Sequence, residues 1–147
     1  MPKKRRPTIV VDEHVHPEIA EVFKEVGFRT LFAARDRRYG GRDEHDYIGQ
    51  LYAANEIFVT SDLKFSLWVL REHGTRHAGL VCLPFADAEF RAGFAAVTAG
   101  WLWGSTDHSP FAIRGKILYW GRGGLHELDS ESRIRIAVPA HSILEEP

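Results

Sequence analysis

Thr8-Ile-Val-Val-Asp12, followed by Pro17-Glu-Ile-Ala-Glu-Val-Phe-Lys-Glu-Val26, is the stretch that decides the fold. Its first part is a short apolar run, which is typical of a strand buried on both faces. Its second part begins with proline and repeats apolar residues every three or four positions up to Gly27, which predicts an amphipathic helix. The stretch therefore predicts a strand followed by a helix, the unit from which parallel sheets are built.

The same alternation continues toward the C-terminus. Further short apolar runs predict strands at residues 29–33, 56–60 and 79–83. The segments between them carry apolar faces with helical spacing around Ile48 and Val69. Strand and helix thus alternate repeatedly, which predicts a doubly wound α/β domain with a central, mostly parallel sheet.

The pattern changes near Gly100. A last helix, which Asp87 can cap, is predicted to end there, and from Trp101 on turn residues and short alternating runs predict antiparallel strands. We therefore predict one α/β domain over residues 8–100. Residues 101–147 are predicted to form a C-terminal antiparallel β extension, packed on the domain or at a homodimer interface.

Composition narrows the class of protein. With 147 residues, of which 44% are hydrophobic, the chain can bury one core without a disulfide or a structural metal. Its single cysteine, Cys82, lies in an apolar run and is interpreted as an inert core thiol. A net charge of -1 argues against wholesale coating of nucleic acid. Neither a membrane span nor a signal peptide is recognisable, so no membrane partner and a cytoplasmic location are expected.

Acidic residues stand where predicted strands end or helices begin. Asp12 closes the first strand, the cluster Asp43-Glu44-His45-Asp46 precedes a helix, and Asp62 follows the strand Ile57-Phe-Val-Thr60. Because the carboxyl ends of parallel strands share one edge, these side chains can meet in one crevice. Two carboxylates about 5 Å apart repel by roughly 3 kcal/mol at an effective dielectric constant near 20. A hard cation, Mg²⁺ or Mn²⁺, would turn this repulsion into attraction.

Helix capping is the simpler interpretation of two of these groups. Asp43 and Asp62 each precede a predicted helix, as N-cap residues do. Capping explains Asp12 poorly, because Asp12 lies several residues before its helix. The three groups together favour a metal site. Imidazoles stand nearby at His14, His16 and His45, which keeps a Zn²⁺ site open, although strict ligand spacing is missing. His16 is also placed to cap its helix or to contact a substrate.

Basic and aromatic residues suit a polyanionic ligand. A basic arm lies at residues 3–6, and Arg38 and Arg42 belong to a second basic cluster beside the acidic residues. Phosphate contacts of this kind position a nucleic acid, while a solvated loop is the simpler interpretation. Tryptophans provide flat surfaces for unpaired bases, although core packing is the more common role: Trp68, Trp101, Trp103 and Trp120.

The runs VVDEHVHPEIAEVFKEVGF, DEHDYI, IFVTSDLKF and HAGLVCLP, in this order, resemble the PIN-like domain family, in particular its compact branch related to VapC-type toxin ribonucleases. The similarity covers about residues 8–85. It implies a parallel α/β sheet and a Mg²⁺ or Mn²⁺ site of three or four carboxylates that hydrolyses RNA phosphodiesters. A toxin would also imply an inhibitory antitoxin protein as partner.

Carried over residue by residue, the resemblance places the first carboxylate of the site at Asp12 and the third at Asp62. Glu44 or Asp46 would supply the second, with Asp43 a less favoured choice. The family often has another acidic residue two positions after the third carboxylate, where this chain has Lys64.

The resemblance also implies roles for neighbours of these carboxylates. Thr60 or Ser61 would orient water or substrate, and Lys64 would bind a phosphate oxygen. The positive charge of Lys64 would also weaken a second metal site.

Other interpretations remain open. A PIN-like module that no longer cleaves, and instead binds RNA or a protein, is the main one. A response-regulator receiver domain would also have acidic residues near Asp12 and Asp62, but it needs Thr or Ser where this chain has Leu83-Pro84. A phosphatase of the haloacid-dehalogenase type would need a second Asp in place of His14.

Overall fold

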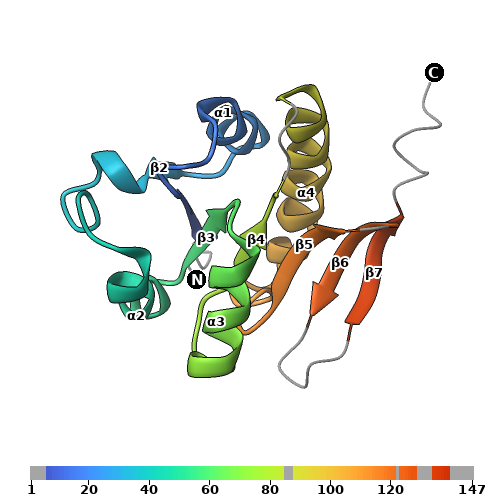
Figure 1. Ribbon diagram of the computed structural model, residues 1–147. Coiled ribbons are helices and arrows are strands. Elements are labelled where there is room, and N and C mark those ends of the chain that lie inside the picture. Colours follow the sequence, from blue (N-terminus) through green and yellow to red (C-terminus); the bar gives the residue numbers. More distant parts are fainter. Residues whose placement is uncertain (1–5, 85–87, 122, 129–133, 140–147) are drawn as a thin grey trace.

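Seven strands form one mixed sheet in the computed structural model, which describes residues 6–84, 88–121, 123–128 and 134–139 (Figure 1). The order across the sheet is β2-β1-β3-β4-β5-β6-β7. In chain order the elements are β1 (Thr8–Val11), α1 (Pro17–Val26), β2 (Thr30–Phe32), a short 3-10 helix (Ala33–Arg35), α2 (Glu44–Ala54), β3 (Glu56–Thr60), α3 (Leu63–His73), β4 (Leu80–Cys82), α4 (Ala88–His108), β5 (Ile117–Gly121), β6 (Gly124–Leu128) and β7 (Ile134–Pro139).

Strand β1 lies inside the parallel part of the sheet. Ile9 is aligned with Thr30 of β2 on one side and with Ile57 of β3 on the other. Strands β4 and β5 continue the parallel arrangement, and β6 and β7 then add two antiparallel pairings. The predicted α/β class, the mostly parallel sheet and the antiparallel C-terminal hairpin are confirmed.

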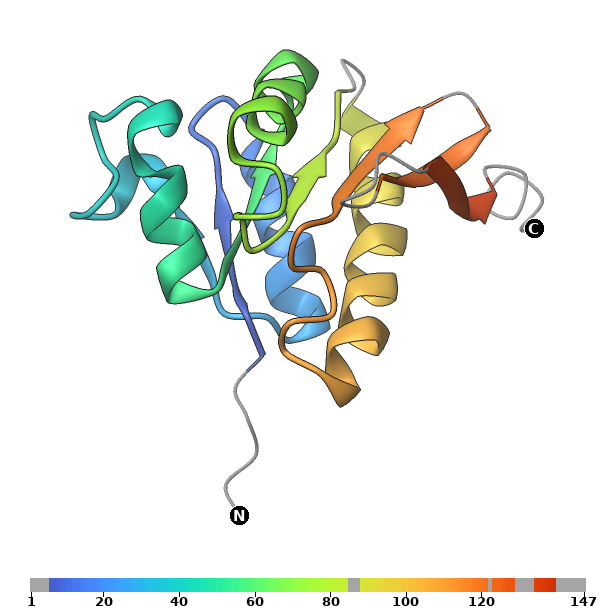
Figure 2. The same cartoon turned by 90° about the horizontal axis from the view of Figure 1, so that it is seen from below.

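Helices cover both faces of the parallel part (Figures 1 and 2). Ile9 and Val11 point to the face packed by α1 and α4, whereas Val10 points to the face packed by α2 and α3. All three are fully buried, because a strand in the middle of a doubly wound sheet has no solvent face. Near-continuous apolar character is therefore the correct sequence signal for β1.

Helix α4 is longer than predicted. It passes through Gly100, where its end was predicted, and includes the Trp101–Trp103 segment that was predicted as strand. A glycine inside a helix costs only about 1 kcal/mol relative to alanine, and the buried Leu102 on the next turn outweighs this cost. The predicted cap of this helix, Asp87, lies outside the described residues.

Strand β5 also differs from the prediction. Its partner β4 runs parallel to it, with Val81 aligned to Leu118, so β5 is the fifth parallel strand and not part of an antiparallel extension. The antiparallel arrangement begins only at β6. Periodicity cannot distinguish these cases, because Leu118 and Trp120 are buried whichever direction the neighbouring strand takes.

Three of the four tryptophans belong to the core on the α1 and α4 side of the sheet. Trp120 is buried and donates its indole N–H to the Thr98 hydroxyl at 2.8 Å. Trp101 and Trp103 of α4 pack against the core shared with α1. Trp103 also meets Phe28 edge to face, with ring centroids 5.1 Å apart. Core packing, the simpler interpretation, therefore holds for these three.

Arg6, shortly before β1, is held by α4. Arg6 donates to the Trp103 carbonyl and the Thr106 hydroxyl and pairs with Asp107 at 2.8 Å. The remainder of the predicted basic arm, residues 3–5, lies outside the described residues. Within the described ranges, no helix is both long enough and apolar enough to cross a bilayer.

Candidate functional site

The strand order creates a crevice at the carboxyl ends of β1 and β3. From β1 the chain moves outward to β2, and the following connection returns past β1 to β3, so the direction of winding reverses between these two strands. In open α/β sheets, ligands bind at such a reversal, outside the carboxyl ends of the strands. Asp12 follows β1 and Asp62 follows β3, so the topology brings two of the predicted acidic groups to this place.

Asp12 is a buried carboxylate. Only 3% of the residue is exposed, and its backbone N–H donates to the Val59 carbonyl at 2.9 Å. One carboxylate oxygen accepts the Thr60 hydroxyl at 3.1 Å. Burial raises the pKa of the Asp12 carboxyl, and the Thr60 hydrogen bond opposes this rise without cancelling it. The positive charge of His14 also lowers the pKa of Asp12, but burial outweighs both effects.

The Thr60 hydroxyl connects the two strand ends. It is completely buried, donates to Asp12 and accepts the backbone N–H of Asp62 at 3.1 Å. A hydroxyl has one proton, so these two bonds assign donor and acceptor roles to Thr60 uniquely. Thr60 was predicted to orient water or substrate, and what the structure shows is that it orients Asp12 and the start of the turn at Asp62.

Asp62 is the N-cap of α3. One of its carboxylate oxygens accepts the Phe65 backbone N–H at 3.1 Å. The residue is exposed, unlike Asp12. The capping interpretation is therefore confirmed for Asp62. It is compatible with ligand binding, because capping uses one oxygen of the carboxylate.

The second acidic group lies at the start of α2. Asp43 is the N-cap and accepts the His45 backbone N–H at 2.8 Å, and its carboxylate contacts the His45 ring at 2.5 Å. These hydrogen bonds lower the pKa of Asp43. Glu44 behaves in the opposite way, because burial first, and then the negative charges of Asp12 and Asp43, raise its pKa. Glu44 is therefore electrostatically linked to the edge at Asp12.

Asp43, Glu44 and His45 form a compact set of possible metal ligands. One ligand atom from each lies within 4.8 Å of the other two, and in the described part of the chain this is the only such group of three. Asp46, a predicted ligand and catalytic residue, is exposed and lies outside this set, and the predicted ligands Asp12 and Asp62 lie outside it as well. The sequence favoured Glu44 or Asp46 over Asp43, and the structure favours Glu44 with Asp43 beside it.

Of the predicted substrate-binding residues, Arg38 is not at the acidic edge. Its guanidinium binds both carboxylate oxygens of Glu56, at 2.8 and 3.0 Å. Glu56 is the first residue of β3 and therefore lies at the amino ends of the strands, away from the acidic residues at their carboxyl ends. The Tyr39 hydroxyl donates to the same carboxylate at 2.5 Å. Arg38 therefore neutralises a buried glutamate that the sequence pattern does not reveal.

Arg42 and His16 also have structural partners. Arg42 donates to the carbonyls of Arg38 and Asp46, at 2.8 and 3.2 Å, and so holds the loop against α2. His16 is the N-cap of α1, because its Nδ1 accepts the Glu18 backbone N–H at 3.1 Å. The capping alternative for His16 is confirmed.

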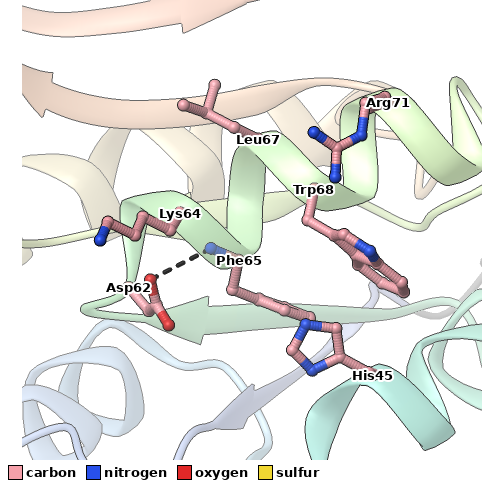
Figure 3. A pocket seen from close by; sticks show the side chains of 7 residues that line it. All are labelled: His45, Asp62, Lys64, Phe65, Leu67, Trp68 and Arg71. Atoms are coloured by element: carbon pink, nitrogen blue, oxygen red, sulfur yellow. Dashed lines mark hydrogen bonds between the residues drawn. The ribbon is translucent and has the colours of Figure 1, made fainter.

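A groove of about 480 Å³ runs along α3 from the acidic edge (Figure 3). Lys64 lines it together with Asp62, and the predicted contact of Lys64 with a phosphate oxygen stays a prediction. The lining consists of His45, Asp62, Lys64, Phe65, Leu67, Trp68 and Arg71. Trp68, the fourth tryptophan, is thus the one that combines packing with a position in this groove.

Sequence reasoning missed Tyr47 and Arg71. Tyr47 is buried, and burial followed by the negative charges of Asp12 and Glu44 raises the pKa of its hydroxyl, which places the ring close to the carboxylates. Its position three residues after Glu44 on the same helix face was a usable signal. Arg71 follows Lys64 by seven residues, or two helical turns, and the stripe that they share was equally readable.

Comparison of the chain with protein-family models, with curated proteins and with solved structures gives no match.

Proposed function

We propose that the edge formed by Asp12, Thr60 and Asp62 is a divalent-cation site at which RNA phosphodiesters are hydrolysed, as the resemblance to PIN-like ribonucleases implies. The observation that carries the proposal is the Thr60 hydroxyl, which joins Asp12 to Asp62 at the point where the direction of winding reverses. Glu44 adds a third carboxylate through its electrostatic link to Asp12.

The residues at this edge fit Mg²⁺ or Mn²⁺. Carboxylates are the protein ligands that these hard cations prefer. Burial raises the pKa values of Asp12 and Glu44, and the negative charges of neighbouring carboxylates add to the rise. Asp12, Glu44 and Asp62 would hold the cation, with Asp43 and His45 beside Glu44. A bound cation polarises a phosphate and lowers the pKa of a bound water. Zn²⁺ is less suited, because the described cluster contains a single imidazole.

The surrounding residues prepare the edge for this role. Thr60 fixes the direction of the Asp12 carboxylate, and the cap at Asp62 leaves one carboxylate oxygen for a cation. Lys64 stands beside Asp62 and can bind a phosphate oxygen.

The test is a calorimetric titration with Mn²⁺, with an RNA digest run on the same samples. Asp12→Asn and Asp62→Asn remove one charge each and keep an oxygen that accepts from Thr60 or caps α3, so both variants should fold. We expect at least ten-fold weaker Mn²⁺ binding and loss of cleavage in both.

The matched control is Glu25→Gln, an exposed residue of α1 on the opposite face of the sheet. It changes the net charge by the same amount and should leave Mn²⁺ binding and cleavage unchanged. Equal weakening in all three variants would mean that Mn²⁺ responds to net charge and not to a site. Intact protein that binds no Mn²⁺ would end the proposal.

A PIN-like module that binds without cleaving is the second candidate. It is favoured by Lys64, which puts a positive charge beside the cation site, and by the cap duties of Asp43 and Asp62. RNA binding that is the same in wild type and Asp12→Asn, with no Mn²⁺-dependent cleavage in either, would support this candidate.

One feature of the structure supports the receiver-domain alternative, and another opposes it. The order of its five parallel strands, 2-1-3-4-5, is found here. However, β4 ends at Cys82, a buried thiol whose pKa burial raises to about 11, and Leu83-Pro84 follows. No hydroxyl residue stands at this strand end to assist phosphoryl transfer.

A further inference from the structure

The groove along α3 combines a fixed aromatic side chain with cationic side chains on one stripe of the helix. Lys64, Trp68 and Arg71 are spaced by four and three residues, which places them on the same side of α3 (Figure 3). The stripe starts next to Asp62 and leads away from the acidic edge. A ligand lying along it would therefore reach from the cation site to Arg71.

The Trp68 indole is held in place by its neighbours. The His45 ring meets it edge to face with centroids 4.3 Å apart, and the Phe65 ring lies nearly parallel to it at 6.0 Å. The His73 ring touches it from a third direction at 5.4 Å. Trp68 is nevertheless only half-buried. A large flat side chain that is fixed before binding loses little conformational entropy when a ligand stacks on it.

The cations of the stripe are available to an anion. Within the described residues, Lys64 forms no ion pair, and Arg71 pairs only with its neighbour Glu72 at 3.2 Å. Both partners of that pair are more than half exposed, so water screens it and it contributes little. Among the described residues that line the groove, the one carboxylate is Asp62, which belongs to the proposed cation site.

We propose that Trp68 stacks an unpaired base of a single-stranded nucleic acid whose phosphates lie on Lys64 and Arg71. This inference rests on the proposed function, because it names the subsite that positions the polynucleotide beside the cation site. In a duplex the faces of the bases are stacked inside the helix, so only an unpaired base can offer its face to the indole. Trp68 would then determine where along a strand the phosphate meets the acidic edge.

The test measures fluorescence anisotropy of a labelled ten-nucleotide RNA in EDTA, so that no cation takes part. DNA of the same sequence and the matching RNA duplex are measured alongside. Wild type should bind the single strands and should bind the duplex at least ten-fold more weakly. Trp68→Ala should weaken single-strand binding about ten-fold or more, whereas Trp68→Phe, which keeps an aromatic face, should recover most of it.

The electrostatic part has a matched control of its own. Arg71→Gln should weaken binding and reduce the dependence on salt concentration, because one phosphate contact is lost. Arg76→Gln removes the same charge from an exposed turn outside the groove and should do neither. Wild-type affinity in Trp68→Ala, equal binding of the duplex, or no binding at all would overturn the subsite.

Failure of the subsite and failure of the proposed chemistry give different results. Binding that depends on Trp68 in EDTA, without cleavage when Mn²⁺ is added, keeps the subsite and rejects the hydrolytic site. Mn²⁺-dependent cleavage together with RNA binding that is unchanged in Trp68→Ala keeps the hydrolytic site and rejects the subsite. If Trp68→Ala weakens RNA and DNA binding equally, Trp68 recognises the base. If only RNA binding is weakened, the 2′-hydroxyl also contributes to recognition.

Discussion

Two buried ionisable side chains, Asp12 and His77, sit in surroundings that oppose their charged forms. Asp12 has a hydroxyl as partner, and the ring nitrogens of His77 have no hydrogen-bond partner among the described residues. Burial raises the pKa of Asp12 and, together with the nearby His73, lowers the pKa of His77 to about 4. Both residues therefore make stability depend on pH, in opposite senses.

Asp12→Asn should stabilise the fold while it removes cation binding. The folded pKa of Asp12 is raised, so the folded state binds the proton more tightly and wild type loses stability as pH rises through that value. In EDTA at pH 7 we expect the variant to gain on the order of 1 kcal/mol in unfolding free energy. Urea unfolding from pH 4 to 8 measures this. A gain that stays constant over the range would contradict this explanation.

His77→Leu should stabilise the fold most at acid pH. The folded pKa of His77 lies below its unfolded value near 6.5, so the unfolded chain takes up a proton first and stability falls as pH decreases from 6.5 to about 4. The gain of the variant at pH 5 should exceed that at pH 7.5 by on the order of 2 kcal/mol. Urea unfolding at the two pH values measures this, and an equal gain at both would contradict the explanation.

For single residues, the sequence predicted the position of a side chain in the fold better than the residues that it contacts. Asp12, Glu44 and Asp62 could be located because strand ends and helix starts leave local signals. The partnership of Arg38 with Glu56 could not, because eighteen positions separate two residues that meet only after β3 has paired with β1. A basic cluster has the same composition whether it faces a substrate or neutralises a buried glutamate.

Among the elements, the contact of α1 with α4 depends on a close approach at Gly27. Gly27 ends α1 with φ +127°, and a β-carbon built there would lie 2.7 Å from the Trp103 ring. Both the backbone conformation and the space require glycine. The end of α1 was predicted from this glycine, but its contact with Trp103 was not, because residues 101–103 were predicted as strand.

Gly27→Ala should destabilise the protein by about 2 kcal/mol or more, since the methyl group would push Trp103 away and strain the backbone. Gly49→Ala is the matched control. Gly49 is exposed in the middle of α2, and a β-carbon added there would have no neighbouring atom within 4 Å. This control substitution should stabilise the protein by about 0.5–1 kcal/mol. Thermal unfolding of both variants measures these changes in stability. Equal changes in the two variants would contradict the close contact between Gly27 and Trp103.

For the molecule as a whole, the outer edge of the sheet is the feature that stands out. Among the described residues, strand β7 pairs only with β6, and Ile134 and Ile136 on it are 62% and 52% exposed. Exposed apolar edge strands favour pairing with another chain. The homodimer predicted at the C-terminal extension stays a prediction, and this exposed apolar strand offers a surface for it.

Ile134→Lys combined with Ile136→Lys should abolish self-association, because charges on an edge strand prevent pairing. Sedimentation equilibrium over a hundred-fold concentration range measures it. Leu63→Lys with Leu67→Lys, two exposed apolar residues of α3, is the matched control and should leave the association unchanged. Wild type that remains a monomer throughout would contradict the prediction. Truncation after Gly100 is unsuitable, since it removes the buried Leu102 and Leu118.

The alternation of strands and helices in the sequence predicts only part of the arrangement of the sheet. Alternating strands and helices indicated a parallel sheet, but the order of strands is a property of the connections and leaves no periodic signal. The position of the crevice depends on that order. The sequence therefore reveals the acidic residues but not the strand order that brings Asp12 and Asp62 to the same crevice.

The place of β1 between β2 and β3 also bears on how the protein is made. Translation delivers β1 and β2 early, but the second neighbour of β1, Glu56–Thr60, emerges only after α2 has been synthesised. Until then the nascent chain presents the free edge of an apolar strand, a surface that chaperones bind and that aggregates readily. We therefore expect that chaperones can bind the free edge of β1 until residues 33–60 have been synthesised.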